Sequence, residues 1–304
     1  MFAAAIGSDR GPDSSRKTAK SCTGKTTFLS ACLTACLAFC LAVAITPAHA
    51  SEASDWSGNT QAGARLIAGG DADQTGSRIR RAGVEIRLAP GWKTYWRYPG
   101  DSGVPPHFDF SGSENVKNVT VLWPAPRRFT ADDDITIGYK DNVIFPLRIE
   151  PQRTDQPMLL RLTFDYAICE KICVPAEARL ELRLDGTHDT ILDRRLSAAE
   201  ARVPHQVSGA GLAIISVQRD KAAPERVLVD VKTPAGIVPE LFVEGPSPDW
   251  ALPVPVPVAG AAEGAQRFAF ALDGLPRGAK ARGAVLTFTA TAGTEAIEIR
   301  HPLD

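Results

Sequence analysis

The sequence predicts an all-β protein built as two tandem β-sandwiches behind a cleaved signal peptide. From Ala64 onward, apolar residues recur in short alternating or continuous runs, and Gly, Pro, Asp and Asn separate the runs. Strands at this spacing, with turn residues between them, are typical of β-sandwiches. A linker after Pro204 interrupts the series. The predicted parts are therefore a signal peptide (1–50), a first sandwich (51–203) and a second sandwich (204–304).

Residues 1–50 have the three regions of a secretory signal. Four basic residues lie between Arg16 and Lys25, and the apolar run Thr26–Ile45 carries no charge. The following Thr46–Ala50 ends on a small-x-small pattern, so we expect cleavage before Ser51. No later stretch approaches the roughly 20 apolar residues of a spanning helix. We therefore expect a secreted, periplasmic protein, in a compartment where disulfides can persist.

Lipidation is an alternative fate for the N-terminus. Leu33–Cys36 (Leu-Thr-Ala-Cys) resembles a bacterial lipobox, which would make Cys36 a lipid anchor. The residues after Cys36 remain apolar as far as Ile45, where a lipoprotein would normally show a polar tether. Cleavage at Ala50 is therefore the favoured prediction.

Charge excludes one broad class of partner. Residues 1–50 hold five of the 34 basic and two of the 35 acidic residues, which leaves 29 against 33 and a net charge of about −4 in the mature chain. A small negative charge favours solubility, and no basic excess suggests binding to nucleic acid or to an anionic membrane.

The first strand series follows from alternation. Val84, Ile86 and Leu88 alternate with Glu85 and Arg87, which is the pattern of a half-buried strand. The predicted strands of this series, which Gly186 ends, are Ala64–Ala68, Arg81–Ala89, Lys93–Arg97, Val116–Leu122, Val143–Ile149, Met158–Tyr166 and Ala178–Leu184.

A short helix and a second strand series follow. Ser197–Val203 reads as a helix capped by Ser197, because Glu200 stands three residues later and Pro204 lies just beyond the end. The predicted strands of the second sandwich are Ala213–Val217, Arg226–Lys232, Glu240–Val243, Arg267–Leu272, Ala284–Thr291 and Glu295–Arg300.

Cys169 and Cys173 are the only cysteines after the leader. Three residues separate them, between the strand Met158–Tyr166 and Pro175, and no amphipathic helix follows. A ring this small restrains the unfolded chain by only about 2 kcal/mol, so a structural staple is the weakest interpretation. Redox exchange is favoured and a soft-metal clip stays open. Lys171 would favour a thiolate while Asp165 and Glu170 would oppose it, so the sequence leaves the thiol pKa undecided.

Several motifs resemble the N-terminal periplasmic (alpha) domain of DsbD-type thiol:disulfide interchange proteins, and most closely the branch that includes ScsB. They are the cysteine segment Tyr166–Pro175, the aromatic segment Gly91–Gly103, and the segments Trp123–Phe129 and Ile137–Pro146. They occur in the family's order, and the resemblance spans roughly 64–186.

The resemblance implies an immunoglobulin-like sandwich that passes electrons through a Cys169/Cys173 dithiol, by thiolate attack and a mixed disulfide, without a small-molecule cofactor. It also implies a cap loop with an aromatic shield. The region Arg128–Tyr139 falls there, so Phe129 or Tyr139 is the expected shield, and Tyr95 and Tyr166 are expected neighbours of the site.

The family's domain takes electrons from a membrane-embedded thiol reductant conduit, which must here be a separate chain, and reduces oxidised periplasmic thiol proteins. Clients in cytochrome c maturation or copper tolerance both fit the resemblance. A Cys173→Ala variant would trap the mixed disulfide. The role of residues 204–304 is not legible from the sequence.

The alternative function is a periplasmic Cu(I)-binding protein that uses the same cysteines. Copper-delivery proteins of the Sco type also carry two cysteines three residues apart, followed closely by Pro, but they are thioredoxin-like and need a distant histidine. His188 is the nearest histidine downstream of Cys173 and would complete a soft-ligand site. Loss of sub-micromolar Cu(I) binding on replacing Cys169 would favour this alternative.

Overall fold

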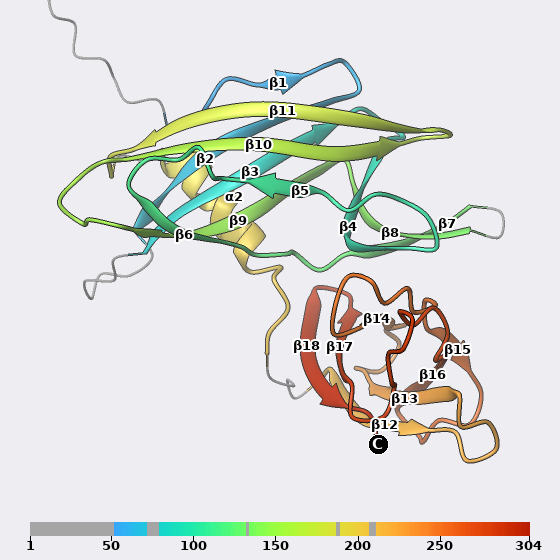
Figure 1. The fold of residues 1–304 in the computed structure, drawn as a ribbon. Helices are drawn as coiled ribbons and strands as arrows, with labels where there is room; N and C mark the ends of the chain where they lie inside the picture. Colours follow the sequence, from blue (N-terminus) through green and yellow to red (C-terminus); the bar gives the residue numbers. More distant parts are fainter. Residues whose placement is uncertain (1–51, 72–78, 132–133, 187–188, 207–210) are drawn as a thin grey trace, which may run out of the picture. The chain divides into compact units, whose positions relative to one another are not determined.

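The computed structural model describes residues 52–71, 79–131, 134–186, 189–206 and 211–304. The predicted signal peptide, its cleavage site and Cys36 lie outside the described residues. Residues Ala50–Asp304 form one compact unit. The predicted all-β class is confirmed, since the described chain is built from four sheets and one helix (Figure 1).

The first sandwich consists of β1–β11 and places two sheets face to face. One sheet has the order β1 (Ser57–Gly58), β2 (Ala62–Asp71), β3 (Arg80–Leu88), β9 (Asn142–Pro151) and β6 (Val116–Val121). The other has the order β11 (Cys173–Leu184), β10 (Met158–Cys169), β4 (Lys93–Gly100), β8 (Asp134–Lys140) and β7 (Arg127–Ala131), and β5 (His107–Asp109) pairs with β10.

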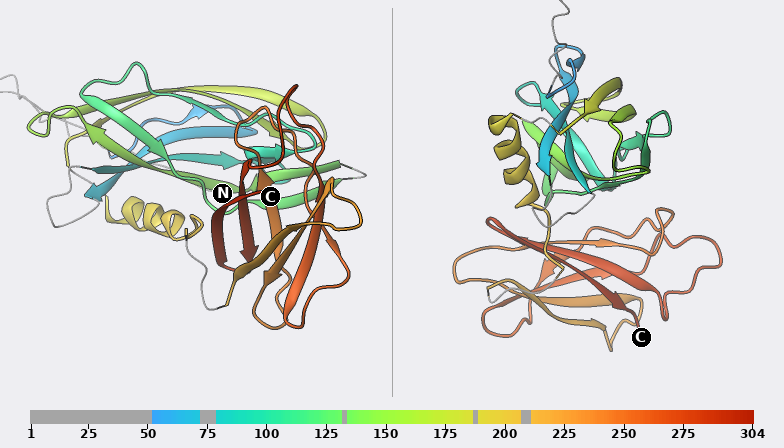
Figure 2. Two further views of the ribbon diagram at one scale, coloured as in Figure 1. Left: turned by 60° about the horizontal axis from the view of Figure 1, so that its bottom comes forward. Right: turned by 90° about the vertical axis from the view of Figure 1, so that its left-hand side faces the viewer.

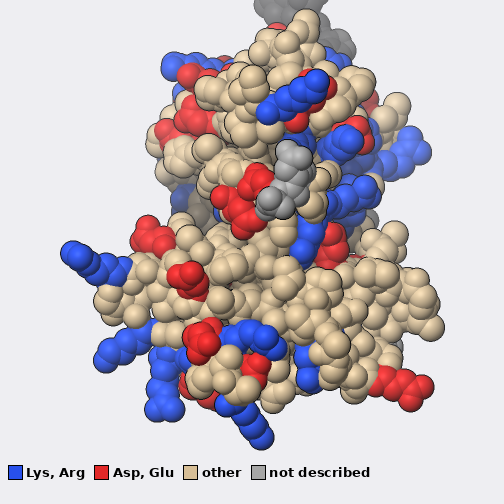
Figure 3. All heavy atoms as spheres, turned by 90° about the vertical axis from the view of Figure 1, so that its right-hand side faces the viewer, with Lys and Arg blue, Asp and Glu red and all other residues tan. Residues whose placement is uncertain are grey.

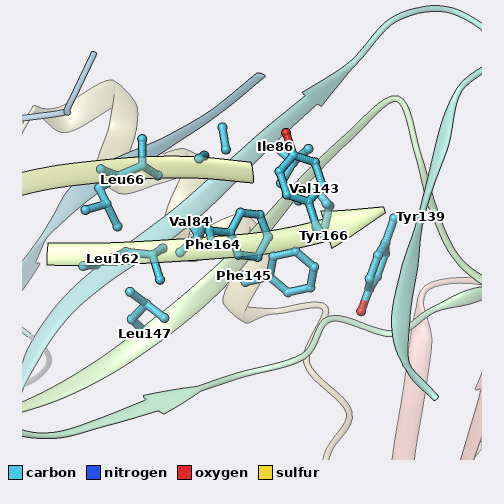
Figure 4. Close-up of a cluster of buried hydrophobic side chains, with 14 of the residues drawn as sticks. Leu66, Val84, Ile86, Tyr139, Val143, Phe145, Leu147, Leu162, Phe164 and Tyr166 are labelled. Atoms are coloured by element: carbon cyan, nitrogen blue, oxygen red, sulfur yellow. The ribbon is translucent and has the colours of Figure 1, made fainter. Parts of the chain in front are cut away.

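Alternating residues of both sheets fill the space between them. On β10, Leu160, Leu162, Phe164, Tyr166 and Ile168 point inward and are almost completely buried. They meet the inward side chains of β3 and β9, and Figure 4 shows this core. Because side chains alternate along a strand, the odd-numbered residues of β10, including Cys169, lie on the outer face of their sheet.

The second sandwich consists of β12–β18. Its four-stranded sheet has the order β12 (Ala213–Arg219), β13 (Arg226–Lys232), β16 (Ala265–Ala271) and β15 (Val256–Val258). Its three-stranded sheet has the order β14 (Glu240–Glu244), β17 (Val285–Ala292) and β18 (Glu295–Pro302). A core that includes Val229, Leu241, Phe268 and Phe288 lies between them. The boundary between residues 203 and 204 stays a prediction.

The predicted helix over Ser197–Val203 is wrong at its start. Helix α2 spans Thr190–Glu200, and its N-cap is Asp189, whose carboxylate accepts hydrogen bonds from the amides of Ile191 and Leu192. The Asp189 cap lies eight residues upstream of the predicted one and satisfies amides that would otherwise lack partners. Ser197 lies inside the helix and accepts a hydrogen bond from Arg81.

Helix α2 covers the outer face of the sheet that contains β2, β3 and β9 (Figure 2). Leu196 is fully buried there in a cluster with Ile67 and Ile144. Arg81 completes the contact, because its guanidinium donates to Asp193, Ser197 and Glu200 at 2.6–2.9 Å. Arg148 also pairs with Glu200. None of the helices in the described part of the chain is long and apolar enough to cross a membrane.

Candidate functional site

The two cysteines face each other across the tip of one β-hairpin. β10 and β11 pair in continuous antiparallel register from Met158↔Leu184 to Cys169↔Cys173, and Glu170–Ile172 make the turn. Directly opposed residues of an antiparallel pair have Cα atoms about 4.5–5.5 Å apart, which lies within the range that a disulfide spans. Both cysteines are free thiols in this structure. The hairpin can therefore open and close a disulfide without a change of register.

The two thiols differ in accessibility. Cys173 is exposed at the start of β11, next to Ile172, whose side chain is 75% exposed. Cys169 is only 9% exposed and clusters with Tyr95 and Ala167 on the outer face of the sheet. An approaching protein can touch the sulfur of Cys173, whereas Cys169 is shielded by its neighbours.

Tyr95 links the two thiols. Its hydroxyl lies 2.8 Å from Cys173 Sγ and also interacts with Cys169, and its side chain is only 1% exposed. Burial, and then the hydrogen bonds to the thiols, raise the pKa of Tyr95 well above its ordinary value of 10.0. The phenol therefore stays protonated at physiological pH and can donate to a thiolate.

The loop after β4 closes over the Tyr95 ring. Gly103 has a φ of +128°, and a Cβ at this position would lie 2.4 Å from Tyr95 Cε1. The loop is fixed to β8, because the amide of Asp101 donates to Ile135 O and the amide of Ile135 donates to the Asp101 carboxylate. Only glycine combines this backbone conformation with so close an approach.

Burial raises the pKa of Cys169, and the proximity of Cys173 adds to the rise. The hydrogen bond from Tyr95 and the charge of Lys93 act in the opposite direction. Lys93 is the direct β-partner of Cys169, as the register Cys169↔Lys93 shows. Burial therefore disfavours the thiolate of Cys169, and Tyr95 and Lys93 partly offset this effect.

Phe129 lies beside this group on the β7–β8 hairpin. The ammonium of Lys93 sits 5.7 Å from the centroid of the Phe129 ring and donates to Thr136 Oγ1 at 2.7 Å. Strand β7 lies at the same end of the first sandwich as the tip of the β10–β11 hairpin (Figure 1). Through Lys93, the structure thus connects Phe129 to the cysteine hairpin.

The other two predicted neighbours belong to the core. Tyr139 is buried, packs edge-on against Phe145 and donates its hydroxyl proton to Pro124 O at 2.8 Å. Tyr166 stacks on Phe164 and has the inward orientation of Ile168, opposite to that of Cys169. Neither lies on the outer face that carries the thiols, so Phe129 and Tyr95 are the better candidates for site residues.

Metal ligands do not gather around the thiols in the part of the chain that the structure describes. No group of three His, Cys, Asp or Glu side chains there could hold a metal ion. His188, the predicted third copper ligand, lies outside the described residues. Acidic and basic side chains are interspersed at this end of the molecule (Figure 3).

Sequence reasoning missed three contributors to the site: Lys93, Thr94 and Gly103. Thr94 Oγ1 donates to Ala167 O at 2.8 Å and so ties β4 to β10 beside the cysteine hairpin. The contacts of Lys93 and Thr94 join residues more than 70 positions apart in the sequence, whereas Gly103 contacts the nearby Tyr95. All three residues lie in the aromatic segment Gly91–Gly103, whose resemblance to the family is the signal that could have pointed to them.

Comparison with known proteins shows what the first sandwich is similar to. Residues 64–185 match the family described as "Thiol:disulfide interchange protein DsbD, N-terminal". A solved structure, the N-terminal periplasmic domain of ScsB from Proteus mirabilis, aligns with a TM-score of 0.66 and 22% sequence identity, over 83% of this chain and 98% of that chain. The structural match therefore extends beyond residues 64–185. No curated protein is significantly similar to the chain.

Proposed function

We propose that residues 64–185 form an exchange module that works through Cys169 and Cys173. These residues match the N-terminal family of the DsbD thiol:disulfide interchange proteins, and this match confirms the resemblance of the motifs. The observation that carries the proposal is the pairing of an exposed Cys173 with a buried Cys169 at one hairpin tip, with the Tyr95 hydroxyl between them.

The reductive half-cycle starts at the exposed sulfur. The Cys173 thiolate attacks one sulfur of a client disulfide, the client S–S bond breaks, and the client's second sulfur leaves as a thiolate and takes up a proton. Cys169 then loses its proton and attacks Cys173 Sγ. This step releases the client as a dithiol and leaves a Cys169–Cys173 disulfide, so two electrons and two protons have passed to the client.

Recharging uses the same sulfur in reverse. A partner thiolate attacks Cys173 Sγ of the disulfide, and Cys169 leaves as a thiolate that takes up a proton. The partner's second thiolate then attacks its own sulfur in the mixed disulfide, which releases Cys173 and leaves the partner oxidised. A leaving thiol with a raised pKa departs slowly, which the hydrogen bond from Tyr95 and the charge of Lys93 counteract. All the groups needed for the exchange are protein side chains.

The proposed setting is the periplasm, in keeping with the periplasmic domain to which the fold is similar. A membrane-embedded thiol conduit would supply electrons. The clients would be oxidised periplasmic thiol proteins, in cytochrome c maturation or in copper tolerance. The flanking genes and the identity of trapped clients distinguish these two roles.

Trapping of mixed disulfides tests the exchange function. Exposure of Cys173 reverses the roles assumed from the sequence, so the informative variant is Cys169→Ala, which keeps the accessible thiol and removes the one that would resolve the complex. Cys173→Ala is the matched control. We expect a covalent complex with a periplasmic or membrane thiol protein in the first variant and a much weaker one in the second. The proposal fails if neither variant forms any such complex.

A redox titration adds a second test, because the Cys169/Cys173 dithiol and its disulfide must equilibrate reversibly with glutathione. An anaerobic Cu(I) titration of the reduced protein, with and without Cys169, separates the copper alternative. Sub-micromolar binding that disappears with Cys169, in a protein that forms no mixed disulfide, would favour the copper alternative.

A further inference from the structure

Strand β4 joins the cysteine hairpin to the second sandwich. Its first three residues serve the thiols: Lys93 pairs with Cys169, Thr94 donates to Ala167 O, and Tyr95 bonds to Cys173. Its next three residues all contact the second sandwich. The strand thus carries one set of contacts directly after the other, with no intervening residue.

Arg97 makes the most specific of the contacts between β4 and the second sandwich. Its guanidinium donates from Nε and Nη2 to the two carboxylate oxygens of Glu244 at 2.8 and 2.7 Å, and Nη2 also bonds to Glu298. The arginine side chain is 23% exposed and both glutamates are less so. Bidentate pairing in a setting largely withdrawn from water fixes orientation as well as distance.

The flanking residues extend this contact. The Trp96 ring lies 5.7 Å from that of Phe242, and the hydroxyl of Tyr98 donates to Leu252 O. On the β7–β8 hairpin, Arg128 donates from Nη2 to Pro255 O at 2.7 Å. Residues of the second sandwich therefore hold both β4 and the β7–β8 hairpin, the two elements that border the thiols.

β14 is buried on both faces, which shows that this contact is built into the sequence. Leu241 and Val243 point into the core of the second sandwich, whereas Phe242 points the other way and is still 0% exposed. Phe242 belongs to the core cluster of the first sandwich. Glu240 and Glu244 flank it on the same face and face Arg128 and Arg97.

His205 and Gln206, which precede the second sandwich, are also held by it. The amide of His205 donates to Ala296 O, and the amide of Glu298 donates to His205 O. Gln206 and Thr289 both donate to the Glu298 carboxylate, at 3.2 and 3.3 Å. Glu298 therefore receives hydrogen bonds from the first sandwich, from the connecting segment and from its own sheet.

We propose that the second sandwich is a positioning module for the dithiol: through Glu244 and Glu298 it holds Arg97, and through β4 it holds the Tyr95 hydroxyl at Cys173. This inference rests on the proposed role of the two cysteines and assigns a role to residues 213–304. Tyr95 touches the reacting sulfur, and Arg97, Glu244 and Glu298 act through it.

The test is the equilibrium constant for oxidation of Cys169 and Cys173 in a glutathione buffer, measured on the chain without its leader. Tyr95→Phe removes the hydroxyl that bonds to the reduced Cys173, and a net hydrogen bond of about 1 kcal/mol corresponds to a roughly five-fold shift toward the disulfide. We expect Glu244→Gln/Glu298→Gln to shift the constant by about three-fold in the same direction.

The chain offers a matched control. Arg161 on β10 is also held by two glutamates, Glu114 and Glu181, each at 2.7 Å, and it lies outside the stretch of β10 that pairs with β4. Glu114→Gln/Glu181→Gln removes the same number of charges from an arginine on the cysteine-bearing strand. We expect this variant to leave the constant as in the parent.

A double-mutant cycle separates positioning from a general loss of structure. In the Tyr95→Phe background, Glu244→Gln/Glu298→Gln should have no further effect, because the hydroxyl it would misplace is gone. An unchanged constant in the folded interface variant, or an effect of equal size with and without the hydroxyl, overturns the proposal. If the double variant does not fold, Glu298→Gln alone carries the same test, since it keeps Glu244 on Arg97.

Glutathione equilibration needs no client. A protein that forms no mixed disulfide but shows this coupling would disprove the exchange function and leave the positioning role standing. The reverse result would disprove only the positioning role.

Discussion

The contact between α2 and the sheet can be tested through one glycine and one leucine. A Cβ on Gly69 would lie 2.4 Å from Leu196 Cδ2, a distance that side chains do not tolerate. Leu196 is fully buried between Ile67 and Ile144. The leucine therefore occupies the space that the missing Cβ leaves.

The expected magnitudes follow from burial. Leu196→Ala should lower the free energy of unfolding by about 3 kcal/mol, through lost transfer energy and a cavity. Gly69→Ala should cost about 2 kcal/mol, because the new methyl group overpacks the site. In the double variant the new methyl group enters the space that the leucine vacated. We expect a total cost of about 3 kcal/mol instead of 5, so the two changes couple by about 2 kcal/mol.

Urea denaturation of the four proteins, followed by circular dichroism, measures the cycle. The Gly69 methyl group would also approach Arg81 Cβ at 3.1 Å. This contact limits, but does not remove, the stability that the double variant regains. Additive costs, with a double variant about 5 kcal/mol less stable than the parent, would refute the packing argument.

Three further predictions concern ionisation and capping. In a Cys173→Ala variant, the pH at which the rate of Cys169 alkylation reaches half its maximum should lie above 8.5, the ordinary thiol pKa, because burial raises the pKa of Cys169; a half-maximum at or below pH 8.5 would contradict this. Burial opposes the charge of Glu200, but hydrogen bonds from two arginines outweigh it and hold its pKa below the ordinary 4.5; Glu200 should therefore stabilise the fold above pH 4.5, and this stability should be lost as the pH falls through the lower, folded-state pKa. Denaturation at several pH values should then show a shallower acid loss for Glu200→Gln than for the parent, and equal slopes would contradict the linkage. Asp189→Ala removes the N-cap of α2 and should cost about 1 kcal/mol in unfolding free energy, whereas Ser197→Ala should not act as the loss of a cap.

The alternation of apolar and polar residues predicted most strands, because a strand that is buried on one face repeats its apolar residues with a period of two. Val84, Ile86 and Leu88 lie in β3 as expected, and the second series matches β12–β14 and β16–β18 within a few residues. The prediction missed β7, β8 and β15, among others. β7 starts with two arginines and lacks an apolar residue there, β15 contains Pro257, which is disfavoured in strands, and β8 was missed although Ile135, Ile137 and Tyr139 alternate.

The site was predictable only in part. The spacing of the two cysteines was enough to predict that they act as a pair, because the tip of a hairpin involves only residues close in sequence. The contact of Tyr95 with Cys173 crosses 78 residues, and no periodicity reports such a distance. Phe242 was expected within a strand, but its burial against the first sandwich depends on how Trp96 and Arg97 meet β14. Tertiary contacts of this kind set which aromatic residues reach the thiols and which stay inside.

A bond across so short a ring has a consequence for the lifetime of the protein. Because the register of β10 and β11 already brings residues 169 and 173 together, closing the disulfide crosslinks a segment that the fold has ordered. The disulfide should therefore add no more than about 2 kcal/mol to the free energy of unfolding, and the chain stays folded in both redox states. A carrier that passes between these states should then resist proteolysis to a similar degree in each of them.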